Sequence, residues 1–198
     1  HPLAGLEKVI RPYTSHQIAD LYELKEKTKV SIGGLLASHK EFITKKGTRM
    51  SFSALEDLSG KIEIIVFPNT YAECEELLKQ DIPLFISGNL EIDEKGHKII
   101  AESILPLEVK WKQAKNMTIQ IKPEDMDHLE DMQEIFRSHP GTTKVNLEIQ
   151  YPDLKHRVRM QINEPEGVDT NPDFLDRLAS LQGSLDAVHI HWRDKLKQ

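Results

Sequence analysis

The chain has 198 residues, of which 38% are hydrophobic and 29% are charged, and its formal net charge is −6. These values are typical of one large or two small globular domains, and the negative charge argues against a protein that coats nucleic acid indiscriminately. No apolar run approaches the ~20 residues of a membrane helix, and the single cysteine, Cys74, excludes an internal disulfide and a cysteine-based zinc site. The sequence therefore predicts a cytoplasmic protein that contacts no membrane.

Residues 1–29 are predicted to form a connecting segment with one short helix. Ser15, a residue type that caps helices, precedes apolar residues at helical spacing. These apolar residues are Ile18, Leu21 and Leu24. Because the chain begins at His1 without Met, we expect that it is cut from a longer protein.

The centre of residues 30–105 predicts a β-hairpin. Two strand-forming runs, residues 49–55 and 61–67, flank the turn Glu56-Asp57-Leu58-Ser59-Gly60. The acidic pair Glu56-Asp57 fits this turn better than a metal site, because neighbouring residues of a strand point to opposite faces.

Three further strands and one helix complete the pattern of this region. The strand candidates are residues 30–38, 83–93 and 97–104, and the helix is predicted between the third and fourth strands, from Pro68 to Gln80. Gly33-Gly34 predicts a bulge or a sharp bend in the first strand. Five strands in this order predict an OB-fold, a small Greek-key barrel.

Residues 106–117 are predicted to be a linker, and residues 118–198 a second, α+β domain. The second domain has the element order strand, helix, strand, strand, helix, strand, which predicts a ferredoxin-like, split βαβ arrangement. Asn171 followed by Pro172 predicts the cap and first residue of its second helix. The residues of its third strand that are expected to face inward are Val158, Met160 and Ile162.

Motifs of catalysis or cofactor binding are absent from the sequence. It contains no phosphate-binding loop, no nucleophile elbow and no dinucleotide-binding glycine pattern. His189 and His191 share one side of the predicted last strand but have no cysteine or third histidine nearby. The sequence therefore predicts no catalytic residue, no metal site and no cofactor for this chain.

Basic residues concentrate beside the predicted barrel. Residues 39–49 carry four basic residues and one acidic residue, whereas residues 118–198 carry ten Lys or Arg against fifteen Asp or Glu. OB-folds bind ligands on strands two and three, between the loop joining strands one and two and the loop joining strands four and five, here predicted as residues 39–48 and 93–98. Single-stranded nucleic acid binds to such a face through basic and aromatic side chains.

The predicted nucleic-acid-binding residues are Lys40, Phe42, Lys45, Lys46, Arg49, Phe52 and Lys61. The strand residues predicted to form the binding face are Ser51, Phe52, Ser53, Ile62, Ile64 and Val66. Because Phe52 alternates with Met50 and Ala54, the pattern leaves open whether it is exposed or faces the core.

Several landmarks resemble one family, the alpha subunit of the bacterial replicative DNA polymerase III. Residues 43–68 resemble the OB domain near the C-terminus of that family, in the basic loop Thr44-Lys45-Lys46-Gly47, the turn Leu55-Glu56-Asp57 and the strand end Val66-Phe67-Pro68. Landmarks outside this run also match in order. They are His1-Pro2-Leu3, His139-Pro140-Gly141 and Asn171-Pro172-Asp173-Phe174-Leu175.

The resemblance implies that this chain is a C-terminal fragment of a DNA-directed DNA polymerase, a nucleotidyltransferase of the replisome. The carboxylates that hold magnesium would then lie upstream of His1, so the fragment itself would not be an enzyme. The resemblance also implies that the OB domain binds single-stranded template DNA and that residues 118–198 dock the tau subunit of the clamp loader, beside other replisome subunits.

Two other functions remain open at this stage. The basic loop followed by the Leu55-Glu56-Asp57 turn also resembles the anticodon-binding OB domain of class II aminoacyl-tRNA synthetases, whose ligand is tRNA. The chain could also be a pure protein-interaction module whose OB face binds nothing, which the charge difference between its halves allows.

Overall fold

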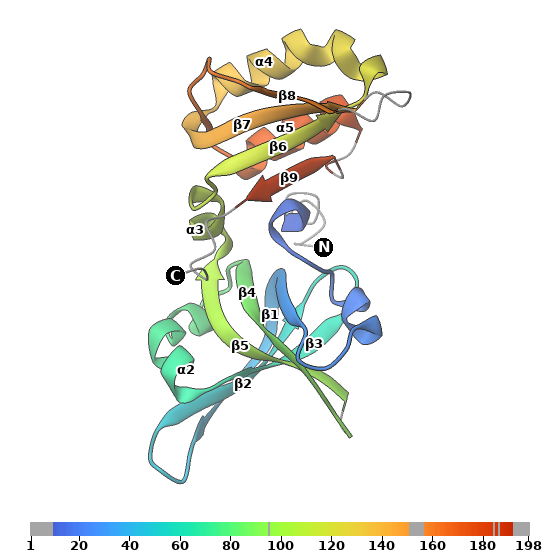
Figure 1. The fold of residues 1–198 in the computed structure, drawn as a ribbon. Helices are drawn as coiled ribbons and strands as arrows, with labels where there is room; N and C mark the ends of the chain where they lie inside the picture. Colours follow the sequence, from blue (N-terminus) through green and yellow to red (C-terminus); the bar gives the residue numbers. More distant parts are fainter. Residues whose placement is uncertain (1–9, 95, 151–156, 184, 186, 192–198) are drawn as a thin grey trace, which may run out of the picture. The chain divides into compact units, whose positions relative to one another are not determined.

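The protein is described here by a computed structural model that covers residues 10–94, 96–150, 157–183, 185 and 187–191. The chain divides between Val109 and Lys110 into two compact units (Figure 1). Among the described residues, no helix is both long enough and apolar enough to cross a membrane. His1-Pro2-Leu3, one landmark of the family resemblance, lies outside the described residues.

The first unit is a closed five-stranded barrel with the strand order β1-β2-β3-β5-β4. Neighbouring strands are antiparallel except β3 and β5, which are parallel. This arrangement confirms the predicted OB-fold, with its helix between the third and fourth strands. The strands are β1 (Lys29–Ile43), β2 (Arg49–Glu56), β3 (Lys61–Val66), β4 (Leu84–Asp93) and β5 (Gly96–Pro106). The helices are the 3₁₀ helices η1 (Arg11–Tyr13), η2 (Ala19–Glu23) and η3 (Leu77–Lys79), with α2 (Pro68–Cys74). The helix α3 (Leu107–Lys112) spans the division between the two units.

The long strand β1 closes the barrel by changing its partner at the glycine pair. Gly34 is the last residue of β1 that pairs with β4, and Leu35 is the first that pairs with β2. A Cβ atom on Gly34 would lie 2.3 Å from the carbonyl oxygen of Glu56, so only glycine allows this approach. The predicted irregularity in β1 is present, but the register shift lies between Leu36 and Ser38, after the glycines.

The predicted turn between β2 and β3 also anchors the N-terminal segment. The Asp57 carboxylate accepts hydrogen bonds from the backbone of Ser59 (2.7 Å) and Gly60 (2.9 Å), and it also accepts one from the backbone of Ile18 (2.8 Å). Ile18 and Leu21 are fully buried in the barrel core. The predicted short helix is therefore the 3₁₀ helix η2, although Ser15 does not cap it and instead hydrogen-bonds to Ser31 of β1.

The second unit is a four-stranded mixed sheet in the order β8-β7-β6-β9, accompanied by helices. Its strands are β6 (Asn116–Ile121), β7 (Pro140–Gln150), β8 (Arg157–Gln161) and β9 (Val188–His191). Its helices are the 3₁₀ helix η4 (Pro123–His128), α4 (Leu129–Ser138) and α5 (Pro172–Gln182). Asn171 caps α5 as predicted, because its side chain accepts a hydrogen bond from the backbone of Phe174 (2.9 Å).

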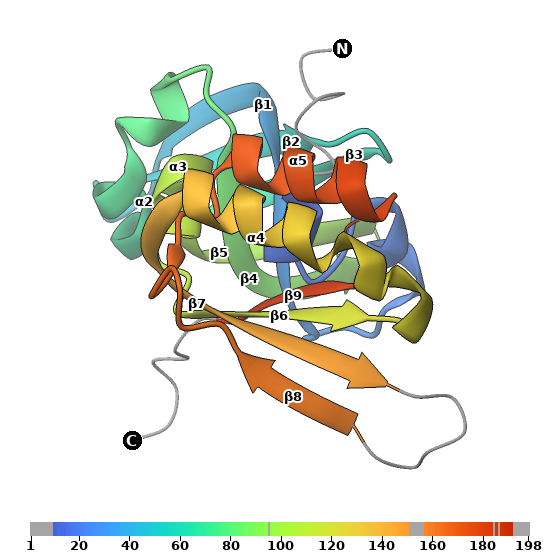
Figure 2. The same ribbon diagram turned by 90° about the horizontal axis from the view of Figure 1, so that it is seen from above.

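The element order predicted for this unit is confirmed, but its strand order differs from the split βαβ arrangement. The two strands joined by α4, β6 and β7, are adjacent and parallel, so no strand separates them. The β8 strand instead pairs with the outer side of β7 and forms the sheet edge (Figure 2). Val158 and Met160 were expected to face inward, but they are 45% and 39% exposed because an edge strand is less covered than its neighbours.

Replacing Gly34 by alanine tests the close approach that closes the barrel. We expect Gly34→Ala to lower the free energy of unfolding by about 1–3 kcal/mol, because the new methyl group would overlap a backbone carbonyl that cannot rotate away. Urea denaturation followed by circular dichroism measures this loss. Ser38→Ala, at an exposed position of the same strand, is the control, and equal stabilities of the two variants would contradict the prediction.

Candidate nucleic-acid interface

The pairing of β2 with its neighbours decides which side chains the barrel presents to solvent. Ser51 and Ser53 are buried in the barrel although they are polar, and Phe52 lies between them on the opposite, outer face, where it is half-buried. The predicted binding face is therefore corrected, because most of its strand residues point inward. The buried residues of that set are Ser51, Ser53, Ile62, Ile64 and Val66. Residues of β2 and β3 on the outer face are Met50, Phe52, Ala54, Lys61 and Glu63, while Ile65 on the same side of β3 is buried.

Phe42 and Phe52 form an aromatic pair on the outer face of β1 and β2. Their ring centroids lie 5.1 Å apart with the planes at 83°, and Phe42 is 39% exposed. Lys40 lies directly opposite Phe52 in the strand register, and its Nζ atom is 5.1 Å from the centroid of the Phe42 ring. One amine and two aromatic rings are thus held together on paired strands.

Lys45 and Lys46 occupy the tip of the β1–β2 hairpin. Residues 39–48 were predicted to be a loop, but β1 continues to Ile43 and the connection is the short turn from Thr44 to Thr48. The backbone of Thr44 donates to the Thr48 carbonyl (2.8 Å), and Gly47 has φ +78°, which is a conformation that favours glycine. The β1–β2 hairpin extends away from the body of the barrel (Figure 1), and both lysines in its turn are exposed.

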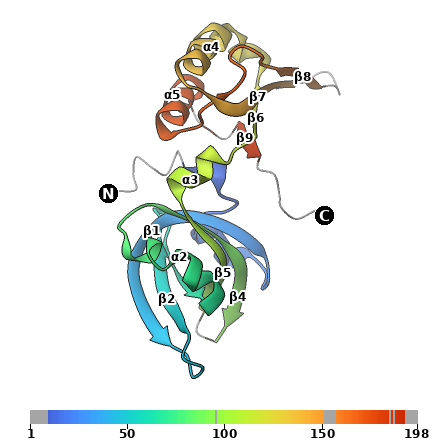
Figure 3. The same cartoon turned by 90° about the vertical axis from the view of Figure 1, so that its left-hand side faces the viewer.

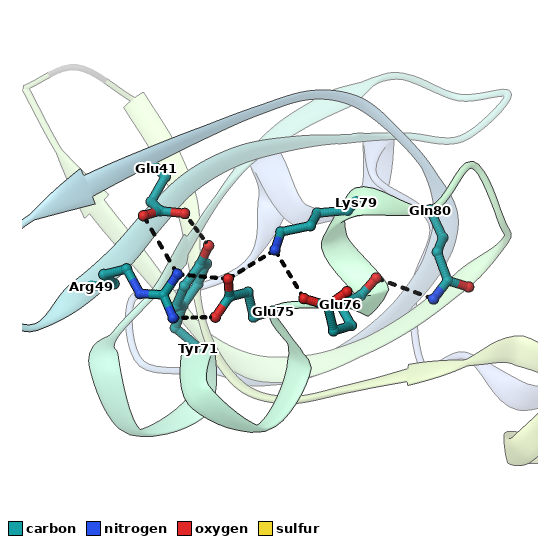
Figure 4. Close-up of polar contacts among 7 residues, drawn as sticks. All are labelled: Glu41, Arg49, Tyr71, Glu75, Glu76, Lys79 and Gln80. Carbon is teal, nitrogen blue, oxygen red and sulfur yellow. Dashed lines mark hydrogen bonds and ion pairs between the residues drawn. The ribbon is translucent and has the colours of Figure 1, made fainter.

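Arg49 lies on the opposite side of the hairpin from the aromatic pair and takes part in a charged network with α2 (Figure 4). Its guanidinium makes two contacts with the Glu75 carboxylate, at 2.6 and 2.5 Å, and lies 3.8 Å from Glu41. Lys79 binds the same Glu75 carboxylate at 2.8 Å. Since Arg49 is compensated by two carboxylates, it adds little positive potential to the outer face.

Tyr71 joins this network to the interior. Its hydroxyl donates to Glu41 (2.8 Å), and burial, followed by this hydrogen bond, raises the pKa of Tyr71 to about 12. The hydrogen bond from Lys79 to Glu75, with Arg49 adding a second, lowers the pKa of Glu75. The network, drawn in Figure 4, therefore links β1 and β2 with α2 and η3. Figure 3 shows β1, β2 and α2 from another side. We call the five residues Glu41, Arg49, Tyr71, Glu75 and Lys79 the hairpin brace.

The opposite end of the outer face is less basic. Lys61, at the start of β3, is exposed, but Lys98 of β5 is bound to Asp93 and lies 3.6 Å from Glu91. Lys95, within the predicted rim of residues 93–98, lies outside the described residues. Among the described lysines of the outer face and the hairpin tip, the cationic character is therefore concentrated on the β1–β2 side.

Two observations concern metal ligands and the single cysteine in the described part of the chain. It holds no group of three or more His, Cys, Asp or Glu that could bind a metal ion. Cys74 is buried in the barrel core, and this burial raises the pKa of its thiol to about 11, which opposes formation of a thiolate.

Comparison with known proteins relates this chain to an OB-fold domain model and to bacterial DNA polymerase III alpha subunits. Residues 30–107 match a family model described as an OB-fold nucleic acid binding domain. The DNA polymerase III alpha subunit of Vibrio cholerae is 28% identical over 189 residues, covering 92% of this chain and 16% of that subunit. The Escherichia coli subunit is 26% identical over 191 residues, covering 93% of this chain and 16% of that subunit.

The chain is homologous to the C-terminal part of bacterial DNA polymerase III alpha subunits. It spans about one sixth of the length of these alpha subunits, so the alpha-subunit polymerase domain is not covered by the match. Among solved structures, the second OB-fold domain of replication protein A from Methanococcus maripaludis is 21% identical, with a TM-score of 0.31, covering 47% of this chain and 94% of that domain.

The hairpin brace has no signal in the sequence. Arg49 and Glu75 are 26 positions apart, and no local pattern relates a turn-flanking arginine to a carboxylate on a later helix. Tyr71 lies within the predicted helix, and no local pattern relates it to Glu41 of β1, to which its hydroxyl donates a hydrogen bond. The contact of Lys40 with Phe42 had a signal, the i, i+2 spacing on one strand face.

The raised pKa of Tyr71 in the hairpin brace predicts that the free energy of unfolding depends on pH in the alkaline range. Because its pKa is raised in the folded protein, the stability from neutral Tyr71 is complete below pH about 10 and is lost as the pH rises toward about 12. Urea denaturation at several alkaline pH values should show a smaller loss of stability for Tyr71→Phe than for the wild type. Near neutral pH, the free energy of unfolding of the variant should be about 1 kcal/mol lower than that of the wild type, because Glu41 loses the hydrogen bond from the Tyr71 hydroxyl.

Tyr22→Phe is the matched control, since Tyr22 is 55% exposed. This control should lose stability with rising pH as the wild type does. Parallel curves for the wild type and Tyr71→Phe would show that Tyr71 does not titrate as described.

Proposed function

We propose that this chain is the nucleic-acid-binding and partner-docking part of a bacterial replicative DNA polymerase alpha subunit, which acts in the cytoplasm. Its OB unit binds single-stranded template DNA, and its second unit docks the tau subunit of the clamp loader. The polymerase reaction and its magnesium ions belong to other parts of such a subunit. The observation that carries this proposal is the homology to alpha subunits over nearly the whole chain, together with the aromatic and basic cluster at the β1–β2 hairpin.

The chemistry of the outer face supports single-stranded DNA as the ligand. A base stacked on the exposed Phe42 ring would gain about 1–3 kcal/mol, and every base offers a face for such stacking. Lys40 beside the ring and the lysines of the hairpin tip would meet the phosphates on either side of that base. We assign the phosphate contacts to Lys40, Lys45 and Lys46, with Lys61 as a more distant contact.

Arg49 receives a different role in this proposal. It was grouped with the DNA-binding residues because of its place in the basic run. Its two contacts with Glu75 support the role of orienting the hairpin instead. A brace on one side of the hairpin would keep the aromatic pair and the lysines of the other side in position for DNA.

Charge reversal at the hairpin tip tests DNA binding. We expect Lys45→Glu/Lys46→Glu to weaken binding of a labelled oligo-dT by roughly tenfold or more, because two attractive charges near the phosphates become repulsive. The slope of log affinity against log salt should fall by about 1.4, which is two contacts at about 0.7 each for a single strand. Fluorescence anisotropy at low and moderate salt measures both quantities.

The charge-matched control is Lys25→Glu/Lys27→Glu, a pair of exposed lysines in the N-terminal segment. This control should bind DNA nearly as the wild type does. Equal losses in the two double variants would show that net charge alone drives binding. The same assay with an anticodon stem-loop decides the tRNA alternative, which a clear preference for the stem-loop would favour.

The proposal that the second unit docks tau is tested separately. We expect purified tau to be captured by the intact immobilised chain, and to be captured equally by the Lys45→Glu/Lys46→Glu variant, because the acidic second unit carries this contact. Surface plasmon resonance gives both affinities. If neither protein captures tau, the docking proposal is wrong, and a loss confined to the variant would assign the contact to the hairpin tip.

A further inference from the structure

The β8 strand forms an open edge of the sheet in the second unit. It pairs with β7 on one side, and within the described residues no strand pairs with its other side (Figure 2). All five of its residues are exposed. An exposed edge strand offers backbone donors and acceptors to an additional strand.

The register shows which backbone groups are directed to the open side. The backbone of Ile162 donates to the carbonyl of Val145 (2.9 Å), which marks this pair as hydrogen-bonded. Because such pairs alternate in an antiparallel ladder, Met160 and Val158 bond toward β7, and the residues between them present their backbone outward. The outward set is Arg157, Arg159 and Gln161.

The side chains of β8 divide into an apolar face and a basic face. Val158 and Met160 are 45% and 39% exposed on the side that continues from the buried Ile149 and Leu147. On the other side, Arg157 and Arg159 hold the buried Glu148 at 3.0 and 2.8 Å, while their own side chains stay 60% and 65% exposed.

Glu148 fixes the two arginines without neutralising both. The hydrogen bond from Arg159 is the main cause that lowers the pKa of Glu148, so this carboxylate is ionised and compensates one of two positive charges. Among the residues that the structure describes, Glu148 is the carboxylate that pairs with these two arginines, so one positive charge remains on side chains that are already oriented. A carboxylate brought against this face would meet donors that lose little freedom on binding.

We propose that the open edge of β8 binds an extended segment of a partner protein in which acidic residues alternate with apolar ones. The segment adds as a fifth strand and bonds to the backbone of Arg157, Arg159 and Gln161. Its acidic residues lie on the face of the arginines, and its apolar residues cover Val158 and Met160. This inference rests on the proposed docking role of the second unit and names the surface and the chemistry of the partner.

A second copy of this chain fits the edge less well. If two β8 strands paired antiparallel, arginines would face arginines or lie diagonal to them, and like charges across a ladder are destabilising. An acidic and apolar segment satisfies the charge and the apolar side chains together. Charge complementarity therefore selects a different chain as the occupant.

A labelled seven-residue peptide of alternating Glu and Val, with blocked ends, is the probe for this edge. We expect the intact chain to bind it about tenfold or more tightly than the corresponding Lys and Val peptide, by fluorescence anisotropy. Val158→Ser/Met160→Ser, which removes apolar contact, should weaken binding about tenfold. Gln161→Pro, which removes an outward N–H and leaves the β7 ladder intact, should also weaken it.

Met126→Ser is the matched control, because Met126 is an exposed methionine outside the strand, and it should bind the probe as the wild type does. Circular dichroism melting verifies that each variant is folded. Equal binding of the two peptides, or binding unchanged in the β8 variants, would overturn the proposal. So would a dimer of the chain that dissociates in Gln161→Pro, because β8 would then be occupied by a second copy.

Capture of tau by the same variants separates this inference from the docking proposal. If tau binds the wild type and the β8 variants equally and the probe peptide does not bind, the proposal for the β8 edge is wrong and the proposal that the second unit docks tau stands. If the probe peptide binds as expected and tau is not captured, the proposal that this chain docks tau is wrong and the proposal for the β8 edge stands. Loss of tau in the β8 variants together with loss of the probe supports both.

Discussion

The register between β1 and β2 is the constraint on which the candidate interface depends. It places Lys40 opposite Phe52 and sends Ser51 and Ser53 into the barrel. A slip by one residue would bury Phe52 and expose the serines, because side chains alternate strictly along a strand. Barrel closure prevents the slip, since β1 must also pair with β4, and the change of partner at Gly34 fits one backbone position only.

The two faces of the extended hairpin carry different side chains. One face carries the aromatic rings and amines that we propose to bind DNA, and the other carries the hairpin brace. Exposed ion pairs contribute at most about 1 kcal/mol each, so the main effect of Arg49 and Lys79 is to set the orientation of the hairpin. Tyr71 supplies the more rigid contact, because it is buried and bound to Glu41.

The sequence predicted the parts of the fold that local patterns determine. The Asp57 turn, the five strands and the Asn171 cap have signals that span a few residues, and the structure has all of them. The length of β1 was missed because residues 39–43 are largely polar and exposed, so they show no half-buried alternation. The family resemblance in the basic loop supplied the relationship to polymerase alpha subunits that the comparisons show.

Features that depend on distant partners could not be predicted. Ser51 and Ser53 look like surface residues in the sequence, and their burial follows from the closed barrel. Val158 and Met160 look like core residues, and their exposure follows from the position of β8 at the sheet edge. Arg49 is bound by Glu75, and nothing in the basic run of residues 39–49 indicates this partner, because it lies 26 positions later in the chain.

The most direct measurement is a titration of the isotope-labelled chain with a single-stranded oligonucleotide, followed by NMR chemical shifts. We expect the largest shifts on the outer face of the β1–β2 hairpin, and small shifts in β4 and in the second unit. The residues with the largest expected shifts are Lys40, Phe42, Lys45, Lys46 and Phe52. Shifts centred on the β4–β5 turn or on the second unit, with the hairpin unchanged, would contradict the assignment of the DNA-binding face.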